Sequence, residues 1–135
     1  MQSMLQATAA PTWICLHAGG NDLASIPLKA LTIMALQDIR TLSTMAPNIM
    51  WIWSEVLPRV HYRGAISDAK IEKARKTFNA AIRKGISKLN GQCIKHPLIQ
   101  WDIPILYRPY GVHLSNRGND IFLNDLTMCL SSSKQ

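Results

Sequence analysis

Two short apolar runs flank an amphipathic helical segment, and this strand–helix–strand order constrains the fold more than any other feature of the chain. Trp13–Leu16 is bounded by a proline and a glycine pair, and Asn48–Trp53 is the second run. Between them, from Pro27 to Ala46, apolar residues recur at spacings of three and four. Apolar strands buried on both faces and joined through a helix are typical of parallel sheets.

The second half of the chain continues this alternation. We expect Ser67 to cap a helix whose apolar stripe ends near Asn90, and Ser115 to cap a last helix. Two short extended segments are predicted between them, the second weakened by an internal proline: Cys93–His96 and Ile103–Leu106. The order β-α-β-α-β-α predicts an α/β fold, in which helices cover both faces of a parallel sheet.

Composition indicates one ordinary globular domain. The 135 residues are 47% hydrophobic and 17% charged, unlike disordered chains. Much of the net charge of +7 lies between Asp68 and Lys88, where a solvated helix face explains it. The alternative is a nucleic-acid-associated accessory module that uses this basic helix and exposed tryptophans. Its basic side chains alternate with a core stripe, however, and no nucleic-acid-binding signature is present.

The cysteines and the N-terminus favour a soluble intracellular protein, cytoplasmic or nuclear. Cys15, Cys93 and Cys129 are odd in number and form no C-x-x-C pair, so neither a disulfide framework nor a thiolate zinc site is indicated. Residues 1–10 lack the basic and apolar regions of a signal peptide. No run is apolar for long enough to span a bilayer, so we expect no membrane association.

Two loops carry the candidate functional residues. Gly19-Gly20-Asn21-Asp22 directly follows the first strand, where ligands bind in open parallel sheets. The glycines permit a tight turn, and the Asn21 amide is suited to donate to an oxyanion on a substrate carbonyl. His113 precedes the last helix and is suited to act as a general base. The alternatives are an ordinary turn with an Asn-Asp cap and a surface histidine.

We expect no metal and no other cofactor. The four histidines, His17, His61, His96 and His113, have no H-x-H or H-E-x-x-H spacing.

Taken together, these loops resemble the third and fifth sequence blocks of SGNH (GDSL-like) hydrolases. Three further segments are similar, more narrowly, to SGNH-like domains of vertebrate genomes and retroelements: Trp51–Leu57, Ala74–Asn79 and Gly118–Leu123. The resemblance divides the chain into an extension at 1–11, a partial hydrolase-like domain at 12–130 and a tail at 131–135. It implies a flavodoxin-like three-layer α/β/α sandwich that lacks its first βα units.

The resemblance also implies ester hydrolysis by a serine nucleophile, with Asn21 as an oxyanion donor and His113 as the base. The family's Gly-Asp-Ser block and second oxyanion glycine have no counterpart in the chain, and Tyr110 replaces the aspartate three residues before the histidine. A tyrosine supplies no carboxylate charge at neutral pH. We therefore expect a truncated, inactive esterase domain that retains a cleft for a small ester. Its exposed sheet edge is expected to promote self-association.

Overall fold

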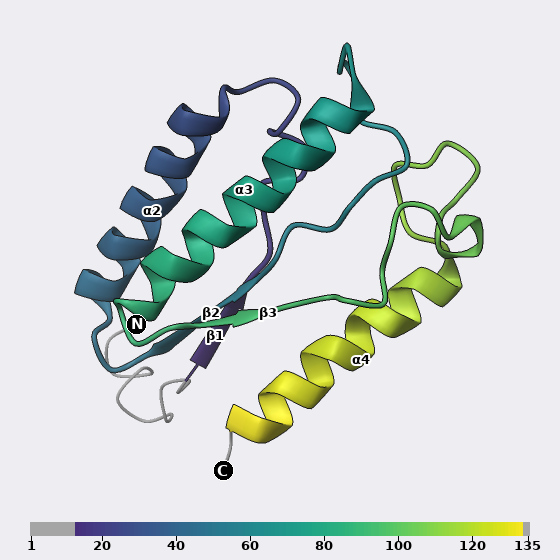
Figure 1. Ribbon diagram of the computed structural model, residues 1–135. Coiled ribbons are helices and arrows are strands. Elements are labelled where there is room, and N and C mark those ends of the chain that lie inside the picture. Colours follow the sequence, from purple (N-terminus) through teal and green to yellow (C-terminus); the bar gives the residue numbers. More distant parts are fainter. Residues whose placement is uncertain (1–12, 134–135) are drawn as a thin grey trace, which may run out of the picture.

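A parallel three-stranded sheet in the order β1-β2-β3 forms the middle layer of the protein. The computed structural model describes residues 13–133, so the predicted extension at 1–11 lies outside the described residues. In chain order the elements are β1 (Trp13–Leu16), α2 (Leu28–Met45), β2 (Met50–Ser54), α3 (Asp68–Ser87), β3 (Gln92–Ile94), the short 3-10 helix η1 (Pro104–Leu106) and α4 (Asn116–Ser133) (Figure 1).

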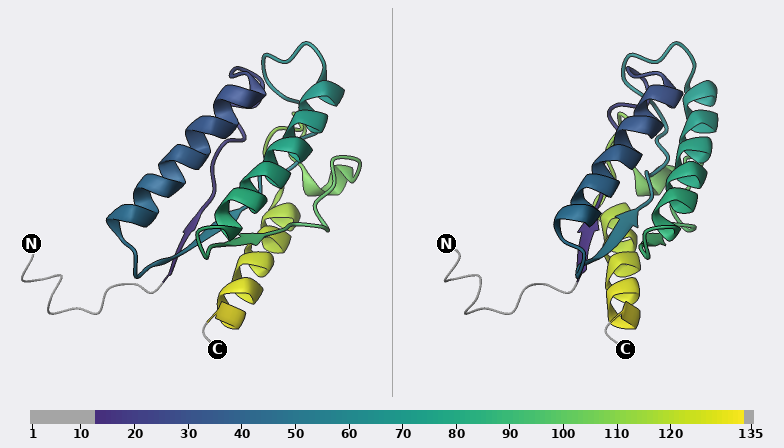
Figure 2. Two further views of the ribbon diagram at one scale, coloured as in Figure 1. Left: turned by 60° about the vertical axis from the view of Figure 1, so that its left-hand side comes forward. Right: turned by 90° about the vertical axis from the view of Figure 1, so that its left-hand side faces the viewer.

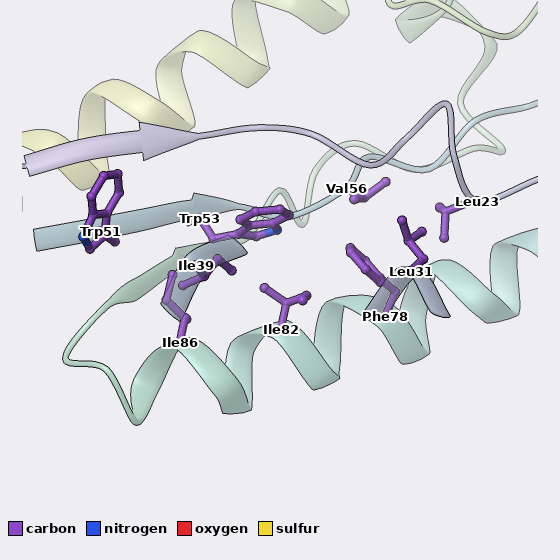
Figure 3. Packing of buried hydrophobic residues seen from close by; sticks show 9 residues of the cluster. All are labelled: Leu23, Leu31, Ile39, Trp51, Trp53, Val56, Phe78, Ile82 and Ile86. Carbon is purple, nitrogen blue, oxygen red and sulfur yellow. The ribbon is translucent and has the colours of Figure 1, made fainter. Parts of the chain in front are cut away.

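Helices cover both faces of this sheet. Helices α2 and α3 lie side by side along one face (Figures 1 and 2), whereas α4 lies on the opposite side of the strands from α3 (Figure 3). The predicted α/β sandwich with a parallel sheet is therefore confirmed. Among residues 13–133, no helix combines the length and apolarity needed to cross a membrane.

The predicted helix caps are present. The Ser67 hydroxyl accepts from the Lys70 amide at 3.3 Å, and the Ser115 hydroxyl accepts from the Gly118 amide at 3.2 Å. Each cap satisfies an amide that the first helical turn leaves without an internal partner.

Two segments differ from the predictions. Ile103–Leu106 is not extended, because Pro104 opens η1, where its fixed φ suits a tight helical turn and its missing N–H is not needed. Helix α4 also continues through Ser133, so the serines at 131–133 lie in a helix and not in a tail. No proline or glycine interrupts α4 there, and serine is only mildly unfavourable in helices. Residues 134–135 lie outside the described part.

The main core fills the space between the sheet and helices α2 and α3. Trp51 and Trp53 of β2 point into it, together with Phe78 and Ile82 of α3 (Figure 3). The exposed fractions of Trp51 and Trp53 are only 6% and 5%. The nucleic-acid alternative expects exposed tryptophans, and for the two tryptophans of β2 this expectation is wrong. The alternate residues of β2, Ile52 and Ser54, face the α4 side because side chains alternate along a strand.

Strand β1 is only half-buried, contrary to the prediction of burial on both faces. It pairs with β2 along one edge, and within residues 13–133 its other edge has no strand partner. An apolar hollow of about 420 Å³ adjoins it, lined in part by Leu16, Leu31 and Met34. Unpaired edges and exposed apolar surface favour association. Self-association through this edge stays a prediction.

Candidate functional site

A tight turn follows β1 and presents Asn21 to solvent. Gly19 has φ +103°, a conformation that L side chains rarely adopt, and its carbonyl accepts from the Asp22 amide at 3.1 Å. Leu23 then returns to the core at 5% exposed. The glycine pair and the buried leucine therefore fix where the exposed Asn21 side chain stands.

Arg59, from the loop after β2, holds the Asn21 side chain. Its Nη2 donates to Asn21 Oδ1 at 2.9 Å. Gly20 makes this approach possible, since a Cβ at that position would lie 2.9 Å from Nη2. Within residues 13–133 the Nδ2 end of the Asn21 amide has no partner and can donate to a ligand.

His113 reaches the same region from the loop that joins η1 to α4. The loop is closed by the Arg108 amide donating to the His113 carbonyl at 2.9 Å, and by Gly111 at φ +68°. A cleft of about 270 Å³ is bordered by His113, His17, Gly20, Arg59 and Phe122, among others. The two loops singled out in the sequence therefore meet at one cleft, although the roles of Asn21 and His113 stay predictions.

Nothing in the described part of the chain orients the His113 ring. Across residues 13–133 its imidazole has no hydrogen-bond or ion-pair partner, and 83% of the surface of Tyr110 is exposed. The nearby Ser115 hydroxyl donates to the Ile105 carbonyl at 2.6 Å while it caps α4. Ser115 is therefore a capping residue and not a nucleophile for His113.

A second polar group, which the sequence does not reveal, connects the sheet to α4. His96 Nδ1 lies 2.9 Å from Asp125 Oδ2, and His96 Nε2 lies 2.7 Å from Ser54 Oγ. Ser54 Oγ lies in turn 2.9 Å from His17 Nδ1. A carboxylate only accepts, so Nδ1 of His96 donates to Asp125. In a neutral ring Nε2 then accepts from Ser54, which accepts from His17.

Asp125, His96 and Ser54 contact one another as the members of a serine hydrolase triad do, but no substrate can reach the Ser54 hydroxyl. Ser54 is 0% exposed, and the Phe122 ring packs against both histidines at 4.8 and 4.9 Å. The backbone amides after Ser54 are occupied too: Glu55 N donates to the Ile94 carbonyl, and Val56 N to the Asn79 side chain. These two amides are therefore not available to stabilise an oxyanion beside Ser54. The group therefore connects the sheet with α4.

Within residues 13–133, no group of three or more histidine, cysteine or acidic side chains is placed to bind a metal ion.

The positive charge of the basic helix α3 is partly neutralised. Arg83 forms a bidentate pair with Glu55, and Arg75 forms one with Glu72. Both arginines stabilise the fold and are less available to phosphates than their sequence suggests.

Comparison with solved structures identifies the fold. A GDSL-like lipase from Bacteroides thetaiotaomicron has a TM-score of 0.72 at 18% identity, over 91% of this chain and 63% of its own. A Bacteroides fragilis protein described as an acylhydrolase has a TM-score of 0.76 at 16% identity, over 93% of this chain and 64% of its own. A family 3 carbohydrate esterase from Clostridium thermocellum has a TM-score of 0.62 at 27% identity, over 86% of this chain and 54% of its own. The chain has a GDSL-like hydrolase fold.

The chain spans between 54% and 64% of the lengths of these structures. Its sequence matches no family model and no curated protein. The likeness to the GDSL-like hydrolases is therefore one of fold, extending over most of this chain and part of theirs.

One histidine of the GDSL-like cleft should make folding stability depend on pH. Partial burial lowers the pKa of His17 most, His96 and Arg59 lower it further, and the Ser54 carbonyl opposes them. Its folded pKa therefore lies below the unfolded value of ~6.5. The resulting stability is complete above about pH 6.5 and declines as pH falls toward the folded pKa, because the unfolded chain takes up the proton first.

Urea unfolding at pH ~7.5 and ~5.5 measures this dependence. We expect His17→Asn, which keeps a donor near Ser54 but does not titrate in this range, to lose less stability on acidification than the wild type. An equal loss in the two proteins would show that other groups cause the acid sensitivity.

Proposed function

We propose that this chain is the C-terminal part of a GDSL-type ester hydrolase domain, which keeps one side of an ester-binding cleft and does not hydrolyse esters by itself. One observation carries the proposal. Gly20 and His113 border the same cleft from loops far apart in sequence, and Arg59, which also borders it, holds the side chain of the neighbouring Asn21.

The chemistry of this cleft follows from its donors. In acyl transfer a histidine removes a proton from a serine hydroxyl, and amide N–H groups stabilise the oxyanion that forms. Here the Asn21 amide would bind the carbonyl oxygen of an ester, and His113 would stand where a proton is exchanged. The sequence contains no Gly-Asp-Ser, and Tyr110 gives His113 no carboxylate partner. Because triad members act as a unit, loss of the nucleophile removes most of the rate.

A serine-reactive fluorophosphonate probe and a short-chain aryl ester assay test the proposal. We expect background labelling and background turnover in the wild type and in His113→Ala alike. His61→Ala is the matched control, since His61 is also exposed and does not line the cleft. Strong labelling, or turnover lost in His113→Ala but kept in His61→Ala, would establish an active hydrolase.

Ester binding is the positive part of the test. Amide NMR spectra recorded during titration with a neutral ester such as dimethyl succinate should show saturable shifts at Gly19, Gly20 and His113. Shifts scattered over the surface, or none with any ester, would contradict an ester-binding cleft.

A further inference from the structure

Arg59 carries the one permanent charge among the residues that border the cleft. Its lining includes one arginine, Arg59, and two histidines, His17 and His113, and no aspartate or glutamate. Asn119 and the Tyr107 side chain are its other polar groups, and the Tyr107 hydroxyl already donates to the Pro58 carbonyl at 2.8 Å. A cleft with low-dielectric walls and charges of one sign concentrates ligands of the opposite sign.

Arg59 has no carboxylate partner in the described part of the chain, whereas Arg75 and Arg83 of α3 each have one. Among residues 13–133 the ion pairs of Asp and Glu go to His61, Arg75, Arg83 and His96, and none to Arg59. Arg59 is partly exposed, and its guanidinium gives one N–H to the neutral Asn21 oxygen. Burial lowers the pKa of Arg59, the nearby Tyr62 opposes this, and Arg63 adds to it. A guanidinium nevertheless stays charged at neutral pH.

Among residues 13–133, the Arg59 charge has no counter-ion. The folded chain has partly removed Arg59 from water and supplied only one amide oxygen. A planar guanidinium still has further N–H donors, whose geometry matches the paired oxygens of a carboxylate or a phosphate. An anionic ligand would complete both the charge and the hydrogen bonds.

We propose that this cleft takes esters that carry an anionic oxygen group, a carboxylate or a phosphate, which Arg59 binds while Asn21 faces the ester carbonyl. The inference rests on the proposed function, because it names the substrate class of the same site. Arg59 then has two connected tasks. One part of its guanidinium holds the Asn21 side chain beside Gly20 at the border of the cleft, and the rest selects for negative charge.

Two esters of nearly equal size separate charge from shape. Monomethyl succinate carries a carboxylate, and dimethyl succinate does not. We expect the first to bind at least about tenfold more tightly in amide NMR titrations, the change produced by one charge-assisted hydrogen bond. Methyl phosphate forms a third arm. Tighter binding of methyl phosphate would identify the anionic group that Arg59 prefers as a phosphate, and tighter binding of monomethyl succinate would identify it as a carboxylate.

Two arginine variants locate the effect. Arg59→Gln should lower the affinity for monomethyl succinate about tenfold or more and bring it to that of dimethyl succinate. Arg63→Gln removes the same charge from an exposed neighbour outside the cleft. It should change the affinity for monomethyl succinate about twofold or less, since salt screens exposed charges. Arg59→Lys keeps the charge and should bind with intermediate affinity. The dispersion of the amide spectrum checks that each variant folds.

Each contrary result has a separate meaning. Equal binding of the charged and neutral esters in the wild type, or equal losses in Arg59→Gln and Arg63→Gln, would overturn the inference and leave the ester cleft standing. Absence of binding by all three ligands would overturn the proposed function as well.

Discussion

Replacing Phe78 by alanine should lower the free energy of unfolding by about 3–5 kcal/mol. Phe78 is 0% exposed and lies in the core between α3, β2 and the loop after β1. Truncation to alanine removes most of an aromatic ring and leaves a cavity that the flanking helices cannot close. Urea unfolding followed by circular dichroism measures the loss.

Thr77→Ala is the matched control on the same helix. Thr77 is exposed, and its hydroxyl only donates to the Lys73 carbonyl, so its replacement should change stability by about 0.5 kcal/mol or less. A loss below about 1 kcal/mol in Phe78→Ala would show that the core rearranges to fill the space. Because domains are stable by only about 5–15 kcal/mol, Phe78→Leu provides a milder variant that stays folded.

Phe78 also supports the candidate site. A Cβ added to Gly19 would lie 3.5 Å from its ring, so the Phe78 side chain lies beside the tight turn before Asn21. In Phe78→Leu we therefore expect the amide resonances of Gly19 and Gly20 to shift more than those of the His113 loop.

Strong periodicity made most of the fold predictable. Helices α2 and α3 carry apolar residues at helical spacing, Ser67 caps α3, and β2 is apolar up to Ser54. The weaker predictions concern properties that depend on neighbours. The burial of β1 depends on what pairs with its outer edge, and the conformation of Ile103–Leu106 depends on Pro104 more than on its apolar residues.

The site was predictable only where a local motif marks it. The glycine turn and the His113 loop are visible as sequence patterns. Arg59 is not, because it joins Asn21 across 38 residues, and Ser54 joins His96 across 42. Period-two alternation does place Ser54 and His96 on one face of the sheet, once the register of β2 with β3 is known. Their link to Asp125 needs the position of α4 as well.

The second large effect is expected at His96, where replacement by alanine should cost about 2–4 kcal/mol. The His96 side chain is only 3% exposed. It bonds to Ser54 at 2.7 Å and to Asp125 at 2.9 Å, and it stacks on Phe122 at 4.8 Å. Alanine removes all three contacts. The Ser54 hydroxyl then stays buried with only His17, and Asp125 loses its partner.

The position of these contacts makes α4 the element that should respond. Ser54 belongs to the sheet, whereas Asp125 and Phe122 belong to α4, so His96 joins the two layers. Hydrogen exchange of α4 amides should therefore accelerate more in His96→Ala than that of α3 amides. His61→Ala, at an exposed ion pair with Asp68, should cost about 1 kcal/mol or less. If His96→Ala cost no more than this control, packing alone would hold α4 to the sheet.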